Sequence, residues 1–241
     1  MSADYSRSHD QFNEALTEAK SAFAADPPRA RAALNRAQRL YAEGWSTAAA
    51  VCPEVDRSVP LSLQSMREAI ERADAAEFGL QRQIASKSLL TIAYRNLDSA
   101  LVKDDLAAAQ AWWPLFVAKF KWDKRPVPAV EAMAEAARDG RKLGRARAAV
   151  KSALVDAFAL KVKEEGMEAV AFGSQDRAVG REKAIEAVVY FGAVDADLAA
   201  RLGAARHQEL ARAVNGLYAA ASEGDAEQVK ALAGRIKGIL T

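Results

Sequence analysis

The feature that most constrains the fold is the recurrence of apolar residues every three or four positions along nearly the whole chain. Leu34, Ala37 and Tyr41 keep this spacing near the start, and Val229 and Leu232 keep it near the end. Such a period places the apolar side chains on one face of a helix. The alternating pattern of a strand is not found, and VAFGS at 170–174 is too short to seed a sheet. Since alanine, leucine and valine also dominate the apolar residues, the sequence predicts an all-α fold.

Helix-start signals divide the chain. Asp26 precedes Pro27, Ser58 precedes a proline by two positions, and Asp225 opens a capping box. Each of these residues is therefore expected to cap the first turn of a helix. Together with the apolar period, the signals predict helices over residues 9–25, 28–48, 60–77, 80–102, 105–121, 127–139, 142–171, 175–192, 196–222 and 225–240.

The two halves of the chain resemble each other. Arg-Ala-Arg-Ala-Ala at residues 29–33 recurs at 145–149, and KSLLTIAY at 87–94 is echoed by KAIEAVVY at 183–190, at a different offset. Repeats of this kind predict either two helical bundles or one pseudo-symmetric stack. We expect two similar antiparallel helical bundles, residues 1–122 and 123–241, which an internal duplication would explain.

Several classes of protein are disfavoured by what the sequence lacks. Cys52 is the only cysteine, so an intrachain disulfide and a multi-thiolate zinc site are excluded. We find no glycine-rich phosphate loop, nucleophile elbow or His-Glu-x-x-His motif, and we expect a protein that is not an enzyme. No apolar run is long enough for a transmembrane segment and no signal peptide is recognised. The expected location is extracytoplasmic if a signal segment precedes this sequence, and cytoplasmic otherwise.

Paired acidic residues form the first candidate site. Glu164 and Glu168 are four residues apart, as are Glu182 and Glu186, and Tyr190 follows four residues later. Like charges at this spacing repel on a helix, and a cation or a facing lysine or arginine would relieve the repulsion. The five residues are candidate metal ligands.

A second interpretation of the acidic residues needs no metal. Arg181 and Lys183 lie beside the second glutamate pair and could neutralise it on a solvated helix face. Oxygen-only cation sites have no fixed spacing outside dedicated loops, so spacing alone leaves both interpretations open. A diiron oxidase is disfavoured because no Glu-x-x-His occurs.

An aromatic and basic segment forms the second candidate site. Its members could pack in the core or between domains, or they could contact a protein partner or an anionic membrane surface. Nucleic acid is disfavoured, because the net charge is only +2 and no recognition-helix pattern is present. The candidate partner-binding residues are Trp112, Trp113, Trp122, Lys124, Arg125, Arg141 and Arg145.

Part of the sequence resembles a known family. Glu-Gly-Met-Glu-Ala-Val at 165–170 resembles the Arg-Glu-Gly-Leu-Glu signature of high-affinity iron permeases. More broadly, residues 145–240 combine a helix with paired acids, a Lys-x-x-Glu helix ending in tyrosine, and final helices led by aspartate. This order of helices and motifs resembles that of the helical regions that accompany bacterial iron permeases outside the membrane.

The resemblance implies a module that captures or hands on iron or another divalent cation beside a membrane permease or other envelope protein. It makes the four paired glutamates ligands, with Tyr190 as a further oxygen ligand or a hydrogen-bond donor to one. Our leading hypothesis is therefore a non-enzymatic helical binding module associated with metal uptake at the cell envelope. The alternative is a helical scaffold without metal that docks through the aromatic and basic segment.

Overall fold

The structure is a computed structural model that describes residues 4–124, 126–139 and 143–241, without the side chain of Arg145. All regular elements in these ranges are helices, which confirms the all-α fold. The elements are α1 (Tyr5–Ala22), α2 (Pro27–Gly44), α3 (Ser46–Ala49), α4 (Pro53–Glu71), α5 (Ala75–Lys103), α6 (Leu106–Lys119), the 3-10 turn η1 (Trp122–Lys124), α7 (Pro128–Asp139), α8 (Gly144–Gly173), α9 (Arg177–Leu202), α10 (Ala204–Glu223) and α11 (Ala226–Ile239).

Two of the three predicted helix caps are confirmed. The carboxylates of Asp26 and Asp225 each accept a hydrogen bond from the backbone N–H three residues later, at 3.0 Å. Each bond satisfies a donor that the first helical turn leaves unpaired. The prediction for Ser58 is wrong, because α4 begins earlier, at Pro53, and Ser58 lies inside it.

A proline lies inside α4, and a tyrosine of a neighbouring helix approaches the carbonyl that the proline leaves without its helical hydrogen bond. Pro60 has no N–H to donate to the carbonyl of Asp56, four residues earlier. The hydroxyl of Tyr41 in α2 lies 3.3 Å from that carbonyl oxygen and 2.5 Å from a carboxylate oxygen of Asp56. The helix continues through a residue that usually ends one.

Two predicted helix breaks are wrong. We expected a break at residues 78–79, but α5 begins at Ala75 and Gly79 lies inside it. We also expected a break at residues 193–195, but α9 runs to Leu202 and is only kinked at Val194, whose φ of −118° and ψ of 16° are not helical. Packing between helices, described below, explains why α5 contains a glycine.

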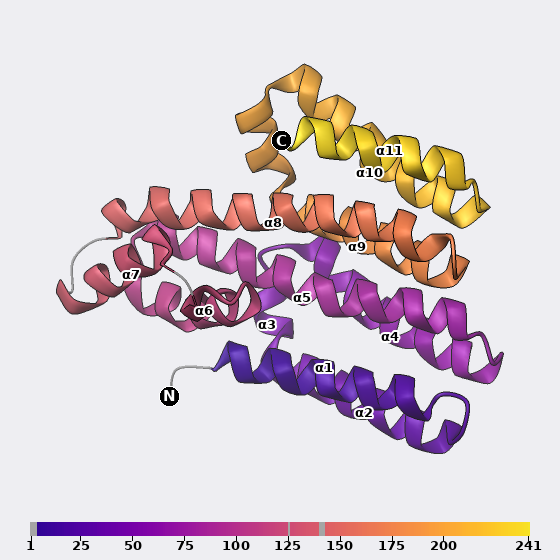
Figure 1. The fold of residues 1–241 in the computed structure, drawn as a ribbon. Helices are drawn as coiled ribbons and strands as arrows, with labels where there is room; N and C mark the ends of the chain where they lie inside the picture. The colour runs from indigo at the N-terminus through magenta and orange to yellow at the C-terminus, as the bar shows by residue number, and fades with distance from the viewer. Residues whose placement is uncertain (1–3, 125, 140–142) are drawn as a thin grey trace.

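The helices form antiparallel hairpins that stack in layers (Figure 1). The order through the stack is α1–α2, α4–α5, α8–α9 and α10–α11, with α6 and α7 at one end. The last hairpin packs on the third through contacts of α10 with α9 and of α11 with α8. Hairpins whose helices are amphipathic can bury their apolar faces in this way.

The two central layers meet along α5 and α9, which run parallel. Arg181 pairs with Glu77 near the start of the contact, and Tyr94 donates a hydrogen bond to Asp197 near its end. The apolar side chains of the described residues form one core that includes Leu34, Leu89 and Leu217 from separate layers. The first and second halves of the chain therefore share a buried interface.

The shared interface helps to choose between the two arrangements that the repeats predict, which are two helical bundles and one pseudo-symmetric stack. The described helices form a continuous stack of hairpins. An internal duplication is not confirmed. The division into residues 1–122 and 123–241 stays a prediction.

Candidate functional site

Glu182 is a buried carboxylate at the contact between α9 and α5. Its side chain accepts a hydrogen bond from Gln83 at 3.1 Å and lies 3.5 Å from the guanidinium of Arg82 and 3.9 Å from the ammonium of Lys20. A Cβ atom at Gly79 would lie only 1.9 Å from a carboxylate oxygen of Glu182. The glycine inside α5 thus makes room for this carboxylate.

Three other carboxylates surround the ammonium group of Lys183, the next residue along α9. The Nζ atom of Lys183 lies 3.0 Å from Glu165, 2.6 Å from Glu168 and 3.8 Å from Glu186. Glu165 and Glu168 project from α8, so the group joins the two helices of one hairpin. We call Lys183 and these three glutamates the Lys183 cluster.

The Lys183 cluster extends to α5 through Glu186. Its second carboxylate oxygen lies 3.2 Å from Nζ of Lys87, and both side chains are largely buried, with exposed fractions of 4% and 14%. Nζ of Lys87 also lies 5.9 Å from the ring centre of Tyr190, within the range of a cation–π contact. Glu186 therefore bridges two ammonium groups from different helices.

The pKa shifts in the Lys183 cluster follow from burial and from charge. Burial, followed by repulsion from Glu186, raises the pKa of Glu165. Burial and then the neighbouring glutamates raise the pKa of Tyr190. Lys183 loses hydration by burial, but the carboxylates more than compensate and its pKa is raised. The lysine is therefore held firmly in its charged form.

The structure thus separates the predicted metal ligands. Glu168 and Glu186 meet at Lys183, Glu182 lies with Arg82, and Glu164 pairs with Lys161 at 2.6 Å. In the ranges that the structure describes, no group of three or more His, Cys, Asp or Glu side chains is arranged to hold a metal ion. The expected convergence of all four glutamates is therefore wrong, because arginine and lysine side chains lie between them.

Two members of this arrangement are absent from the set of candidate ligands that the sequence predicts. Glu165 was not among the assigned ligands, although it is the most buried glutamate of α8, with an exposed fraction of 6%. Lys87 was noticed only within the repeated KSLLTIAY segment. Its pairing with Glu186 depends on the parallel register of α5 and α9, which no local pattern specifies.

Of the two interpretations of the aromatic segment, the structure supports packing in the core, and the partner-binding role of the three tryptophans is wrong. Trp112, Trp113 and Trp122 are buried, with exposed fractions of 5%, 8% and 3%. Trp112 stacks on Tyr5 with ring centres 3.4 Å apart, and Trp113 and Trp122 pack together at 5.3 Å. Side chains packed in this way belong to the core and do not present a surface to a partner or a membrane.

The basic residues of the same prediction are only partly described. Lys124 is exposed in η1. Arg125 and Arg141 lie outside the described residues, as does the side chain of Arg145, whose backbone belongs to the first turn of α8.

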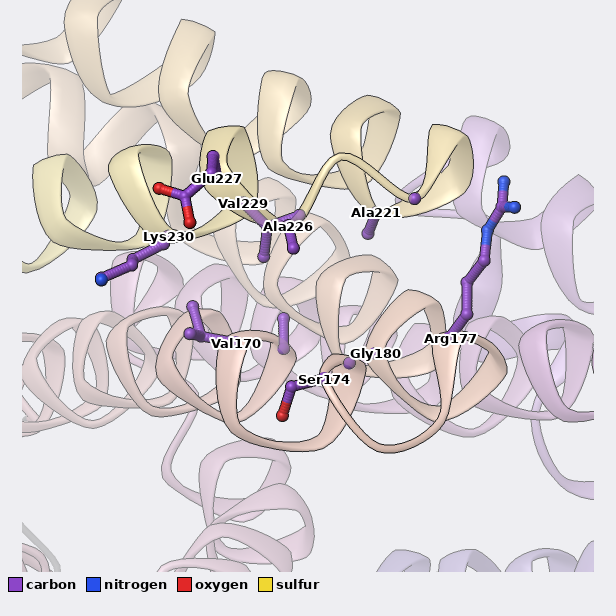
Figure 2. Close-up of a pocket in the computed structure, with 12 residues that line it drawn as sticks. Val170, Ser174, Arg177, Gly180, Ala221, Ala226, Glu227, Val229 and Lys230 are labelled. Carbon is purple, nitrogen blue, oxygen red and sulfur yellow. The ribbon is translucent and has the colours of Figure 1, made fainter.

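A mostly apolar pocket of about 270 Å³ lies between the α8–α9 hairpin and the α10–α11 hairpin (Figure 2). Its walls include Val170, Ala221 and Val229, and charged side chains such as Arg177 and Lys230 reach its edge. None of the clustered glutamates lines it. The pocket is therefore separate from the acidic residues.

His9 predicts a pH dependence of stability. Its pKa is lowered to about 4, first by burial and then by repulsion from Lys119 and Lys87, against the opposing effect of Asp10. The unfolded chain, with a histidine pKa near 6.5, then binds the proton first as pH falls, so stability is lost between pH 6.5 and 4. We expect urea unfolding to show about 2 kcal/mol less stability from this group at pH 5 than at pH 7.

The matched variant for this prediction is His9→Gln, which keeps a polar side chain but cannot titrate. Its stability should fall by less than that of the wild type over the same pH interval. Identical pH profiles for the two proteins would show that His9 is not the group responsible.

Comparison with known proteins identifies the family. The model of the iron permease FTR1 N-terminal domain matches residues 3–238, nearly the whole chain. No curated protein and no solved structure matches the chain. Among the described residues, no helix combines the length and apolar character needed to cross a bilayer. The match confirms the resemblance found in the sequence: this chain belongs to the family of the iron permease FTR1 N-terminal domain, which associates it with iron uptake.

Proposed function

We propose that this chain is a non-enzymatic cation-binding module of an iron-uptake system, and that the cation exchanges with the Lys183 ammonium. The observation that supports this proposal is the convergence of Glu165, Glu168 and Glu186 on one positively charged atom. Carboxylates from neighbouring helices are also among the ligands that hold iron in helical bundles. In this protein an internal ammonium occupies the position that a cation would take.

Iron can take the place of the Lys183 ammonium because the two cations differ in size and charge. Iron carries at least twice the charge of an ammonium group and is smaller, so the same carboxylates can approach it more closely. The Lys183 side chain is 23% exposed and has four flexible methylene groups, which allow it to turn toward solvent. Tyr190, close to the same glutamates, would support the ligands by hydrogen bonding.

The proposed role is to capture the cation and pass it to a membrane permease on the outer side of the cell envelope. A site that an internal lysine can refill suits this role, because the returning ammonium competes with the bound cation. Release then does not require the protein to unfold or the carboxylates to become protonated.

The proposal is tested by titrating Fe(II), without oxygen, into chelator-treated protein. Lys183→Met should bind Fe(II) about tenfold more tightly than the wild type, because loss of about 1.4 kcal/mol of competition corresponds to that factor. Its Tm without iron should be lower, since Glu165 and Glu168 lose their counterion and Glu186 keeps only Lys87, and iron should restore it. Calorimetry and thermal unfolding measure the two effects.

Two further variants complete the test. Glu168→Gln, at a half-exposed position, should weaken Fe(II) binding about tenfold or more. Glu182→Gln is the matched control on α9, because its side chain pairs with α5 instead, and it should leave the affinity unchanged. If neither the wild type nor Lys183→Met binds Fe(II), or if Glu182→Gln weakens binding as much as Glu168→Gln, the proposed site is wrong.

A further inference from the structure

A groove with strong positive charge lies where the C-terminal end of α6 and η1 face α8. Its volume is about 430 Å³, within the range of small-molecule sites. Four of the side chains that line it are lysines, namely Lys119, Lys121, Lys124 and Lys161. Phe120 packs edge-on against Phe158 of α8 with ring centres 5.5 Å apart, which fixes the two sides of the groove relative to each other.

The positive charge of this groove is not balanced by acids. Among the described residues that line it, Glu164 is the only one with a carboxylate, and it is already paired with Lys161 at 2.6 Å. Within the described ranges, Lys119, Lys121 and Lys124 form no ion pair with a carboxylate. This is the reverse of the Lys183 cluster, where each ammonium has acidic partners.

The backbone at Lys121 shows that a lysine here is unusual. Its φ of 55° lies in the left-handed region, directly after the residue that ends α6. Glycine is the common residue at such a position, and another residue costs about 1 kcal/mol. The chain nevertheless places an ammonium-bearing side chain at this point of the groove.

The neighbouring lysines also affect Lys119. Its pKa is lowered to about 8, first by burial and then by repulsion from Lys87 and Lys161, against the smaller opposing effect of Glu186 and Glu165. A bound anion therefore stabilises the charged form of this buried ammonium group more than it would stabilise that of a fully hydrated lysine.

We propose that this groove binds a phosphate-type oxyanion with at least two negative charges, held by the ammonium groups of Lys119, Lys121 and Lys124. Lysine binds phosphate as a point charge and needs no fixed geometry, which suits three flexible side chains around an open groove. The site is distinct from the proposed cation site, because no member of the Lys183 cluster lines it.

Inorganic pyrophosphate is the probe, and calorimetry at two salt concentrations is the measurement. The wild type should bind it, and binding should weaken as salt rises. Lys121→Gly is the most informative variant, because glycine suits the left-handed backbone and the protein should be at least as stable as the wild type. Its affinity for pyrophosphate should fall about tenfold, equal to about 1.4 kcal/mol.

Lys237→Gln, an exposed position on α11, is the matched control, since it removes one positive charge outside the groove. It should bind pyrophosphate like the wild type. Co-sedimentation with vesicles containing phosphatidic acid distinguishes the source of the anion: vesicle binding that Lys121→Gly weakens identifies a lipid headgroup, and pyrophosphate binding alone identifies a free anion. Binding of neither probe, or equal losses in Lys121→Gly and Lys237→Gln, would overturn the proposal.

Discussion

Replacing Glu186 by leucine should lower the free energy of unfolding by about 3 kcal/mol, the range found when one member of a buried ion pair is removed. Lys87 is only 14% exposed and has no other ion pair among the described residues, so its charge would stay buried without a partner. Lys183 keeps two other carboxylates and loses less. Urea unfolding followed by circular dichroism measures the change.

The double variant Lys87→Met/Glu186→Leu is the decisive comparison. Two apolar side chains of similar size remove both charges together, and such replacements are often neutral or stabilising. The double variant should therefore be more stable than Glu186→Leu alone, by about 2 kcal/mol. Additive losses would contradict a direct pairing of Lys87 with Glu186 in the folded protein.

Replacing Gly180 by alanine should destabilise the protein by about 2–3 kcal/mol, as overpacking does, or a fall in Tm of roughly 4–12 °C. A Cβ atom here would lie 2.5 Å from the Cα atom of Gly173 and 3.2 Å from the carbonyl oxygen of Ala169. Both atoms belong to the backbone of α8, so no side chain can move aside. The two helices of this hairpin would have to separate.

Gly234→Ala is the control for this variant. Gly234 is exposed inside α11, and a Cβ atom there would have nothing within 4 Å. The substitution should stabilise the protein by about 0.5–1 kcal/mol, because alanine is the better helix former. Thermal unfolding of both variants tests the comparison, and equal effects of the two substitutions would rule out a close contact at Gly180.

The acidic residues show what a local sequence pattern can predict and what it cannot. Their spacing places Glu182 and Glu186 on one side of α9, and both are buried in the structure. Spacing also left open whether a metal or a basic side chain neutralises them. The partners that the structure provides, Arg82 and Lys87, come from α5, about a hundred residues earlier in the chain.

The tryptophans show the same limit. The sequence left open whether Trp113 and Trp122 pack in the core or contact a partner. A second buried side forms because Trp113 and Trp122 pack on each other at the turn after α6. Helical periodicity describes one helix, but burial depends on everything packed around it.

The sequence by itself determined the helical fold, most helix starts and the family, because periodic apolar residues, aspartate caps and short motifs act over a few neighbouring positions. Only the tertiary structure decided which charges meet. The parallel register of α5 and α9 brings Lys87 to Glu186, and close helix contacts require glycine at positions 79 and 180. These contacts join segments far apart in the chain, and their geometry is fixed by the packing of whole helices.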